Sequence, residues 1–126
     1  MGWALHDPFQ ELRMPNCRVE GTMKTNLVYI TAAGRKEAES IGRDLVSGRL
    51  AAGANIIDNI RSIYWWEGKI RDHEEAIVVV KTRESLVPEL IERVKSIHSY
   101  DCPCIVSLPI IDGNRPFIDW IIEETG

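Results

Sequence analysis

Three residues in the last third of the sequence have side chains that bind soft metal ions: His98, Cys102 and Cys104. Thiolate and imidazole groups are ligands that copper and zinc prefer. In an extended Cys-Pro-Cys segment both thiols can point to the same side. The spacing matches no standard zinc motif, a histidine at a helix end can interact with terminal carbonyls, and free cysteines often pack as small apolar residues. A copper or zinc site at these residues is therefore one hypothesis, and purely structural roles are the other.

The bulk properties restrict the classes of partner. A chain of 126 residues suits one domain that folds without disulfides or a cofactor. A net charge of −4 argues against nucleic-acid binding, which depends on clustered lysine and arginine. The three cysteines come without a recognisable secretory signal, and no apolar run approaches the ~20 residues of a membrane span. We therefore expect a cytoplasmic protein with neither a nucleic-acid nor a membrane partner.

One long β-hairpin is the dominant pattern in the sequence. Strand-forming residues fill 55–66 and 69–82, and the pair Glu67-Gly68 between them suits a tight two-residue turn. At ~3.3 Å per residue each arm reaches about 40 Å, which exceeds the width of a small domain. The tip carries Tyr64, Trp65 and Trp66. Exposed aromatic residues on an overhanging ribbon normally need a cover, and we expect a second copy of the chain to provide it.

The turn also fixes the pairing of the two arms. A centre between residues 67 and 68 places Arg61 opposite Glu74, and such a charge pair favours this register by about 0.2–1 kcal/mol. The second arm is charged over 71–75 and continuously apolar over 76–80. The base of the hairpin therefore belongs to the core and its tip lies outside.

The remaining apolar patterns predict the other elements. They indicate a strand at 26–32, a helix at 35–47, a helix at 85–98 capped by Ser85, a strand at 104–111 with Pro109 at an edge, and a terminal helix from Pro116. The order is βαββαβ plus a final helix. Right-handed crossovers fold this order into an α+β, ferredoxin-like sandwich with both helices on one face of an antiparallel sheet. We expect residues 26–126 to form this domain and residues 1–25 to form an N-terminal extension.

Five short motifs in this order resemble the CutA divalent-cation tolerance proteins over about residues 26–124. They are Arg49-Leu50-Ala51-Ala52, Tyr64-Trp65-Trp66-Glu67-Gly68-Lys69, Val80-Lys81-Thr82, Lys95-Ser96-Ile97-His98-Ser99-Tyr100-Asp101 and Leu108-Pro109. The resemblance implies a homotrimer in which sheet edges and long hairpins interlock. That architecture is similar to the nitrogen-regulatory PII proteins, which favours a signalling role only by analogy.

The resemblance also implies that a polar and aromatic set gathers at clefts between subunits. Its members are Tyr64, Trp65, Trp66, Glu67, Lys81, His98 and Tyr100. A ligand pocket is one interpretation, with Tyr64, Trp65, Glu67, Lys81 and Tyr100 as its lining. Interface packing is the other, with Tyr64, Trp65 and Trp66 at the trimer interface. Packing is favoured for the two tryptophans, and both interpretations stay open for Glu67, Lys81 and His98. No nucleophile with an oriented base is recognisable, so we expect no enzyme activity.

The sequence departs from the family pattern at positions related to metal binding. Gly53 stands where many relatives have a cysteine, Pro103-Cys104 replaces a common Pro-Glu pair, and Cys102 stands where an apolar residue is usual. A metal site transferred by analogy is therefore weakened or rebuilt.

The leading functional hypothesis is a trimeric protein of divalent metal-ion tolerance that binds a copper-type ion or a small ligand between subunits. It would need no cofactor beyond an optional Cu or Zn ion. A trimeric scaffold or PII-like signalling protein is the first alternative. An acylphosphatase-like hydrolase is the second, but residues 31–35 offer one glycine and one arginine, which make a poor anion cradle.

Overall fold

A four-stranded antiparallel sheet is the centre of the computed structural model, which describes residues 23–126. Its strands, in spatial order, are β2 (Gly53–Trp66), β3 (Lys69–Arg83), β1 (Thr25–Ala32) and β4 (Ile105–Pro109). The predicted hairpin is confirmed, and both arms extend further toward the sheet than expected. The last strand is shorter than the predicted 104–111. Residues 1–22 of the predicted N-terminal extension lie outside the described part of the chain.

Three α-helices accompany the sheet: α1 (Arg35–Ser47), α2 (Val87–Ile97) and α3 (Arg115–Glu124). The bounds of α1 agree with the prediction. The expected cap at Ser85 is wrong, because this residue lies in a short 3-10 turn, Glu84–Leu86, and α2 has no side-chain cap. Pro88 sits in the first turn of α2, where its missing N–H needs no partner, so the helix begins next to it.

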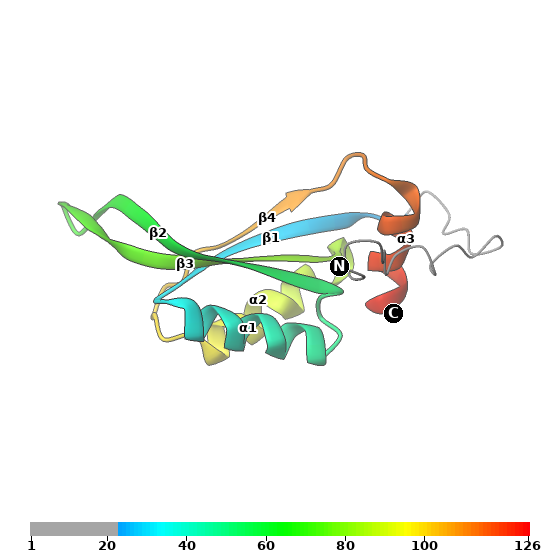
Figure 1. The fold of residues 1–126 in the computed structure, drawn as a ribbon, viewed down its shortest axis with the longest axis horizontal. Helices are drawn as coiled ribbons and strands as arrows, with labels where there is room; N and C mark the ends of the chain where they lie inside the picture. The colour runs from blue at the N-terminus through cyan, green and yellow to red at the C-terminus, as the bar shows by residue number, and fades with distance from the viewer. Residues whose placement is uncertain (1–22) are drawn as a thin grey trace, which may run out of the picture.

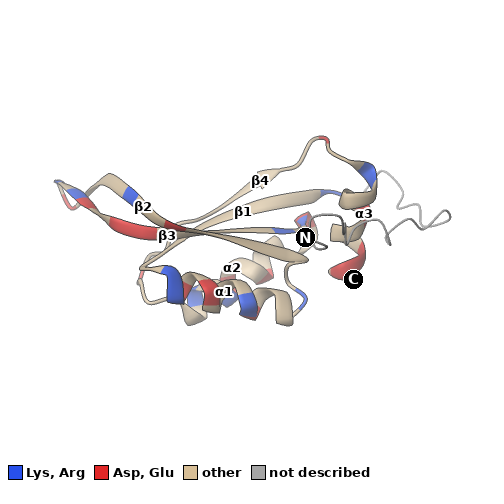
Figure 2. Ribbon diagram, in the orientation of Figure 1, with Lys and Arg blue, Asp and Glu red and all other residues tan. Residues whose placement is uncertain are grey.

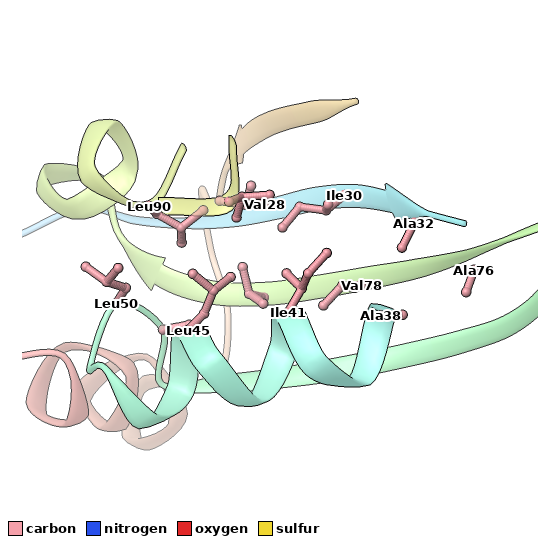
Figure 3. Packing of buried hydrophobic residues seen from close by; sticks show 13 residues of the cluster. Val28, Ile30, Ala32, Ala38, Ile41, Leu45, Leu50, Ala76, Val78 and Leu90 are labelled. Atoms are coloured by element: carbon pink, nitrogen blue, oxygen red, sulfur yellow. The ribbon is translucent and has the colours of Figure 1, made fainter. Parts of the chain in front are cut away.

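The helices α1 and α2 lie together on one face of the sheet, and the β2–β3 hairpin projects well beyond them (Figure 1). This overhang confirms the expectation from its length. Figure 3 shows Ile41 and Leu45 of α1 packed toward Val28 and Ile30 of β1. These four side chains are at most 1% exposed. The predicted α+β arrangement therefore has its core between helices and sheet.

The opposite face of the sheet, which we call the open face, is apolar along its middle. The register places Leu27 and Tyr29 of β1 beside Leu108 and Val106 of β4 on this face. β1 and β4 carry no Lys, Arg, Asp or Glu, and Figure 2 shows their ribbons tan over most of their length. Val106 and Leu108 are each 50% exposed. Within the described chain β2 and β4 are also the sheet edges, so a covering partner would find both apolar side chains and free backbone groups.

The hairpin combines a regular turn with one irregularity. Glu67 and Gly68 have φ values of 52° and 74°, as a type I′ turn requires. Arg61 lies opposite Glu74 as predicted, but its guanidinium binds the diagonal neighbour Asp72 at 2.7 Å. A β-bulge interrupts the pairing between Ile57 and Ile60, where Asn59 has a φ of 60°. The bulge places an extra residue in β2.

Candidate functional site

A wide cleft lies on the open face and runs from the base of the hairpin toward its tip, with a volume of about 1020 Å³. We call it the tyrosine cleft. Strands β1, β2 and β3 form its floor, and residues 100–104, which connect α2 to β4, form one wall. Its lining consists of Tyr29, Thr31, Ile60, Arg61, Ser62, Ile63, Tyr64, Trp66, Glu67, Arg71, His73, Glu75, Tyr100, Asp101, Cys102, Pro103 and Cys104.

A buried carboxylate lies in the cleft. Glu75 is only 6% exposed and accepts a hydrogen bond of 2.8 Å from the Tyr100 hydroxyl. The His73 Nε2 atom lies 3.7 Å from the same carboxylate oxygen. Burial, and then the hydrogen bond to Glu75, raise the pKa of Tyr100 well above its usual value. Tyr100 therefore remains a hydrogen-bond donor at neutral pH.

Two further tyrosines stand beside this pair. Burial raises the pKa of Tyr29, and nearby Cys104 and Glu75 add to the effect because a second negative charge is unfavourable there. The ring of Tyr64 meets His73 edge to face, with ring centres 5.5 Å apart. Strand register explains the grouping, since Tyr64 lies opposite Arg71 and Ser62 lies opposite His73 on the same face.

The wall of the cleft is held by His98. Its Nδ1 atom accepts a 3.0 Å hydrogen bond from the Tyr100 backbone N–H. Its Nε2 atom lies 2.7 Å from the carbonyl oxygen of Thr31 and must therefore carry the proton. This arrangement is a neutral imidazole with both nitrogens engaged. His98 thus fixes the position of Tyr100 over β1.

Glu37 of α1 supports the same wall from the other side. Its carboxylate accepts hydrogen bonds from the backbone N–H groups of Ala33, at 2.9 Å, and Ser99, at 2.8 Å. Burial alone would raise the pKa of Glu37, but these hydrogen bonds outweigh it and hold the pKa below its usual value. The carboxylate therefore links the end of β1 to the start of the wall.

Replacing Glu37 with glutamine is expected to lower the free energy of unfolding by about 1 kcal/mol at pH 7, because the amide loses the charge-assisted bonds. A carboxylate with a depressed native pKa stabilises above its unfolded pKa and loses that contribution as pH falls through the native value. Urea unfolding at pH 7 and at pH 3 should therefore show a difference that shrinks in acid. Glu39→Gln, on the exposed surface of α1, is the control, and an equal loss at both pH values would contradict the prediction.

The cleft gathers much of the predicted ligand set, and two members lie elsewhere. Tyr64, Glu67 and Tyr100 line it. Trp65 pairs with Ile70 and is 71% exposed outside the lining. Lys81 lies further along β3, about 20 Å from Glu75 at the strand's rise per residue. Its ammonium group contacts the Asn55 side chain, and burial lowers its pKa.

The predicted metal ligands do not form a closed set in the described chain. Among residues 23–126 no group of three or more His, Cys, Asp and Glu side chains is arranged to hold a metal ion. His98 uses both ring nitrogens in hydrogen bonds to the backbone. Cys102 and Cys104 are free, exposed and part of the cleft lining. Only the two thiols of the predicted set remain available to an ion.

Sequence reasoning missed Tyr29, Arg71, His73 and Glu75 as cleft residues. The hairpin register contained part of the signal, because residues paired across the strands share a face with Tyr64. Nothing in the local pattern showed that residues 100–104 would fold over these side chains.

Gly53 has a packing role of its own. A Cβ atom added at this position would lie 3.2 Å from the ring of Trp120 in α3. Such a contact is tight, so any larger side chain would require the tryptophan to move. The absence of a cysteine at this position therefore accompanies close packing of α3 against the start of β2.

Comparison with known proteins is consistent with this architecture. The family model described as "CutA1 divalent ion tolerance protein" matches residues 26–124. A divalent-cation tolerance protein CutA of Thermus thermophilus is 44% identical over 79% of this chain and 97% of its own length. The chloroplastic protein CutA 1 of rice is 38% identical over 87% of this chain, which spans 64% of that relative's length.

Solved structures agree as well. The cation tolerance protein Cut A1 from Thermus thermophilus superimposes with a TM-score of 0.79, at 43% identity, over 81% of this chain and 99% of its own. CutA1 from rice gives a TM-score of 0.80 at 38% identity, over 83% and 96%. In residues 23–126 no helix is long and apolar enough to cross a membrane. The extent of the family match and these identities show that the chain belongs to the CutA1 divalent ion tolerance family.

Proposed function

We propose that this chain is the ferredoxin-like subunit of a homotrimer that serves divalent metal-ion tolerance in the cytoplasm without catalysing a reaction. In this proposal the tyrosine cleft takes up a copper-type ion or a small ligand, and a neighbouring subunit closes the cleft. The Thermus thermophilus relative carries divalent-cation tolerance in its name and the matching family model carries divalent ion tolerance in its description, which supports this role.

The observation that carries the assembly is the exposure of large apolar side chains on the open face and hairpin. They are Ile57, Ile63, Tyr64, Trp65, Trp66, Ile70, Val106 and Leu108, between 39% and 71% exposed. Soluble proteins rarely leave so many large apolar groups in water unless a partner covers them. The two free strand edges offer backbone hydrogen bonds to the same partner. A closed ring of identical subunits satisfies both needs.

The two thiols at the cleft support ion binding. Cys102 and Cys104 both line it and are both free. Thiolates favour copper in its reduced form and also bind zinc. The thiols, without His98, are therefore the protein ligands of the proposal.

A hydrolytic role is not favoured, because hydrogen-bond donors in and just after the loop that follows β1 already bind carboxylates of α1. The backbone N–H of Ala33 is bound by Glu37, and the Arg35 guanidinium is bound by Glu39 at 2.8 Å. An anion cradle would need these donors to be free.

Two measurements test the proposal. The mass in solution should be three times the 14.3 kDa of one chain. Under reducing conditions, copper should bind at least tenfold more tightly to the parent protein than to a Cys102→Ser, Cys104→Ser double variant, while Cys17→Ser, a third thiol, should change nothing. A monomeric mass would contradict the assembly. Equal copper affinity of parent and double variant would contradict the ion site.

A further inference from the structure

Glu75 is a buried anion without a permanent cationic partner in the described chain. The Tyr100 hydroxyl that binds it is neutral, and His73, at 3.7 Å, is charged only when protonated. Among residues 23–126 no lysine or arginine nitrogen lies within 4.0 Å of this carboxylate. Removing a carboxylate from water is costly unless a positive charge accompanies it. The position of Glu75 in a cleft suggests that the positive charge comes from outside the chain.

The net charge of the cleft lining also favours a positively charged ligand. Three carboxylates line it, at Glu67, Glu75 and Asp101. Two arginines also line it, but the Arg61 guanidinium is held by Asp72, which lies outside the lining. Arg71 is then opposed by an excess of negative charge. An anionic ligand would be repelled, whereas a cation would be attracted.

Aromatic rings supply the rest of the lining. Tyr29 comes from β1, Tyr64 and Trp66 come from β2, and Tyr100 comes from the wall. The face of an aromatic ring attracts a cation, and tryptophan and tyrosine do so most strongly. Tyr29, Tyr64 and Tyr100 lie near Glu75, whereas Trp66 lines the cleft closer to the hairpin tip. A buried carboxylate flanked by tyrosine rings has the chemistry that recognises an organic ammonium group. A bare metal ion fits less well, because residues 23–126 offer no set of three ligands for it.

We propose that the tyrosine cleft binds the ammonium group of a small organic cation, with Glu75 as its counter-ion and the surrounding rings as its walls. This inference builds on the proposal that the cleft is a ligand site. It depends neither on the trimer nor on the two thiols, because every residue that it uses belongs to one chain.

Three probes of equal shape and different charge test the proposal on the full-length protein. They are phenethylammonium, 2-phenylethanol and 3-phenylpropionate, each titrated at pH 7 and followed by calorimetry. Phenethylammonium should bind at least tenfold more tightly than the alcohol, and the carboxylate should bind most weakly. Equal affinity for the ammonium and the alcohol, or no detectable binding of the ammonium, would overturn the proposal without any variant being made.

A charge-removing variant then assigns the site. Glu75→Gln keeps the shape and an acceptor for Tyr100, so it should abolish the preference for the ammonium over the alcohol. Glu74→Gln is the matched control, since Glu74 is exposed and points to the opposite face of β3, and it should retain that preference. An unchanged preference in Glu75→Gln would overturn the assignment.

The remaining outcomes separate this inference from the proposed function. Loss of copper binding in the double cysteine variant, with ammonium binding intact, would show that the two thiols and Glu75 bind different ligands independently in one cleft. If Glu75→Gln dissociates the assembly and the parent protein binds no ammonium, the counter-ion of Glu75 is a basic residue of a neighbouring copy, and the proposal is wrong. If the protein is monomeric and still prefers the ammonium, the ligand site stands and the trimer does not.

Discussion

Replacing Val106 with aspartate is expected to convert the assembled protein into monomers at micromolar concentration. Val106 lies in the edge strand β4, is 50% exposed, and sits beside Tyr29 on the open face. If this face is covered by a second copy, the variant places a carboxylate in an apolar contact. The cost of burying an unpaired charge is several kcal/mol per site, and symmetry repeats it in every subunit. Each 1.4 kcal/mol of this cost weakens association tenfold.

Val46→Asp is the matched control, because it makes the same chemical change at an exposed valine on α1, 37% exposed on the helical side of the molecule. Light scattering on a sizing column measures both variants against the parent protein. Circular dichroism confirms that each chain still folds. A Val106→Asp protein that keeps the parent mass would show that the open face is not the contact surface.

Replacing Leu45 with alanine is expected to lower the free energy of unfolding by about 2–5 kcal/mol. Leu45 is completely buried and packs in the cluster that joins α1 to the sheet, next to Val28 and Leu90 (Figure 3). The loss combines the transfer free energy of the missing atoms with the cavity that they leave. Since a typical domain is stable by only 5–15 kcal/mol, the effect is a large part of the total.

Val46→Ala provides the comparison, because its side chain is the next one along α1 and is partly in water. Its effect should stay below about 1 kcal/mol. Denaturant unfolding at one fixed protein concentration measures both, since assembly makes stability concentration-dependent. Similar losses for the two variants would contradict the assignment of the core.

The fold was largely predictable because its strongest signals are local. The pair Glu67-Gly68 determined the turn, and the turn determined the register as far as the bulge. Apolar spacing determined α1, whose buried positions are Ala38, Ile41 and Leu45, with Gly42 between them. The start of α2 was predicted wrongly, because the sequence around Ser85 allows a cap, whereas Pro88 and a preceding 3-10 turn decide where the helix begins.

The candidate site was only partly predictable because it depends on distant contacts. Tyr64, Trp66 and Glu67 are neighbours in sequence at the hairpin tip, so their grouping was accessible. The hydrogen bond from Tyr100 to Glu75 joins residues 25 positions apart, and the one from His98 to Thr31 joins residues 67 apart. Neither has a periodic signature. Glu75 therefore looked like one member of a charged, solvated run, although it is the most buried carboxylate of that run.

The bulge at residues 58–59 gives β2 one residue more than the stretch of β3 with which it pairs. On the core side of the bulge the odd-numbered Ile57 shares a face with Ile77, whereas beyond it the even-numbered Ile60 shares a face with Glu75. Side chains alternate along a strand, and the bulge absorbs the extra residue so that the β2 side chains beyond it still share a face with their β3 partners. Deleting Asn59 would leave Asp58 opposite Ala76 and Ile60 opposite Glu75 in an unbroken ladder, so Tyr64 and Trp66 would keep the face that their partners on β3 set. A single deletion at the bulge is therefore tolerable, because it makes the pairing regular without exchanging the two surfaces of the ribbon.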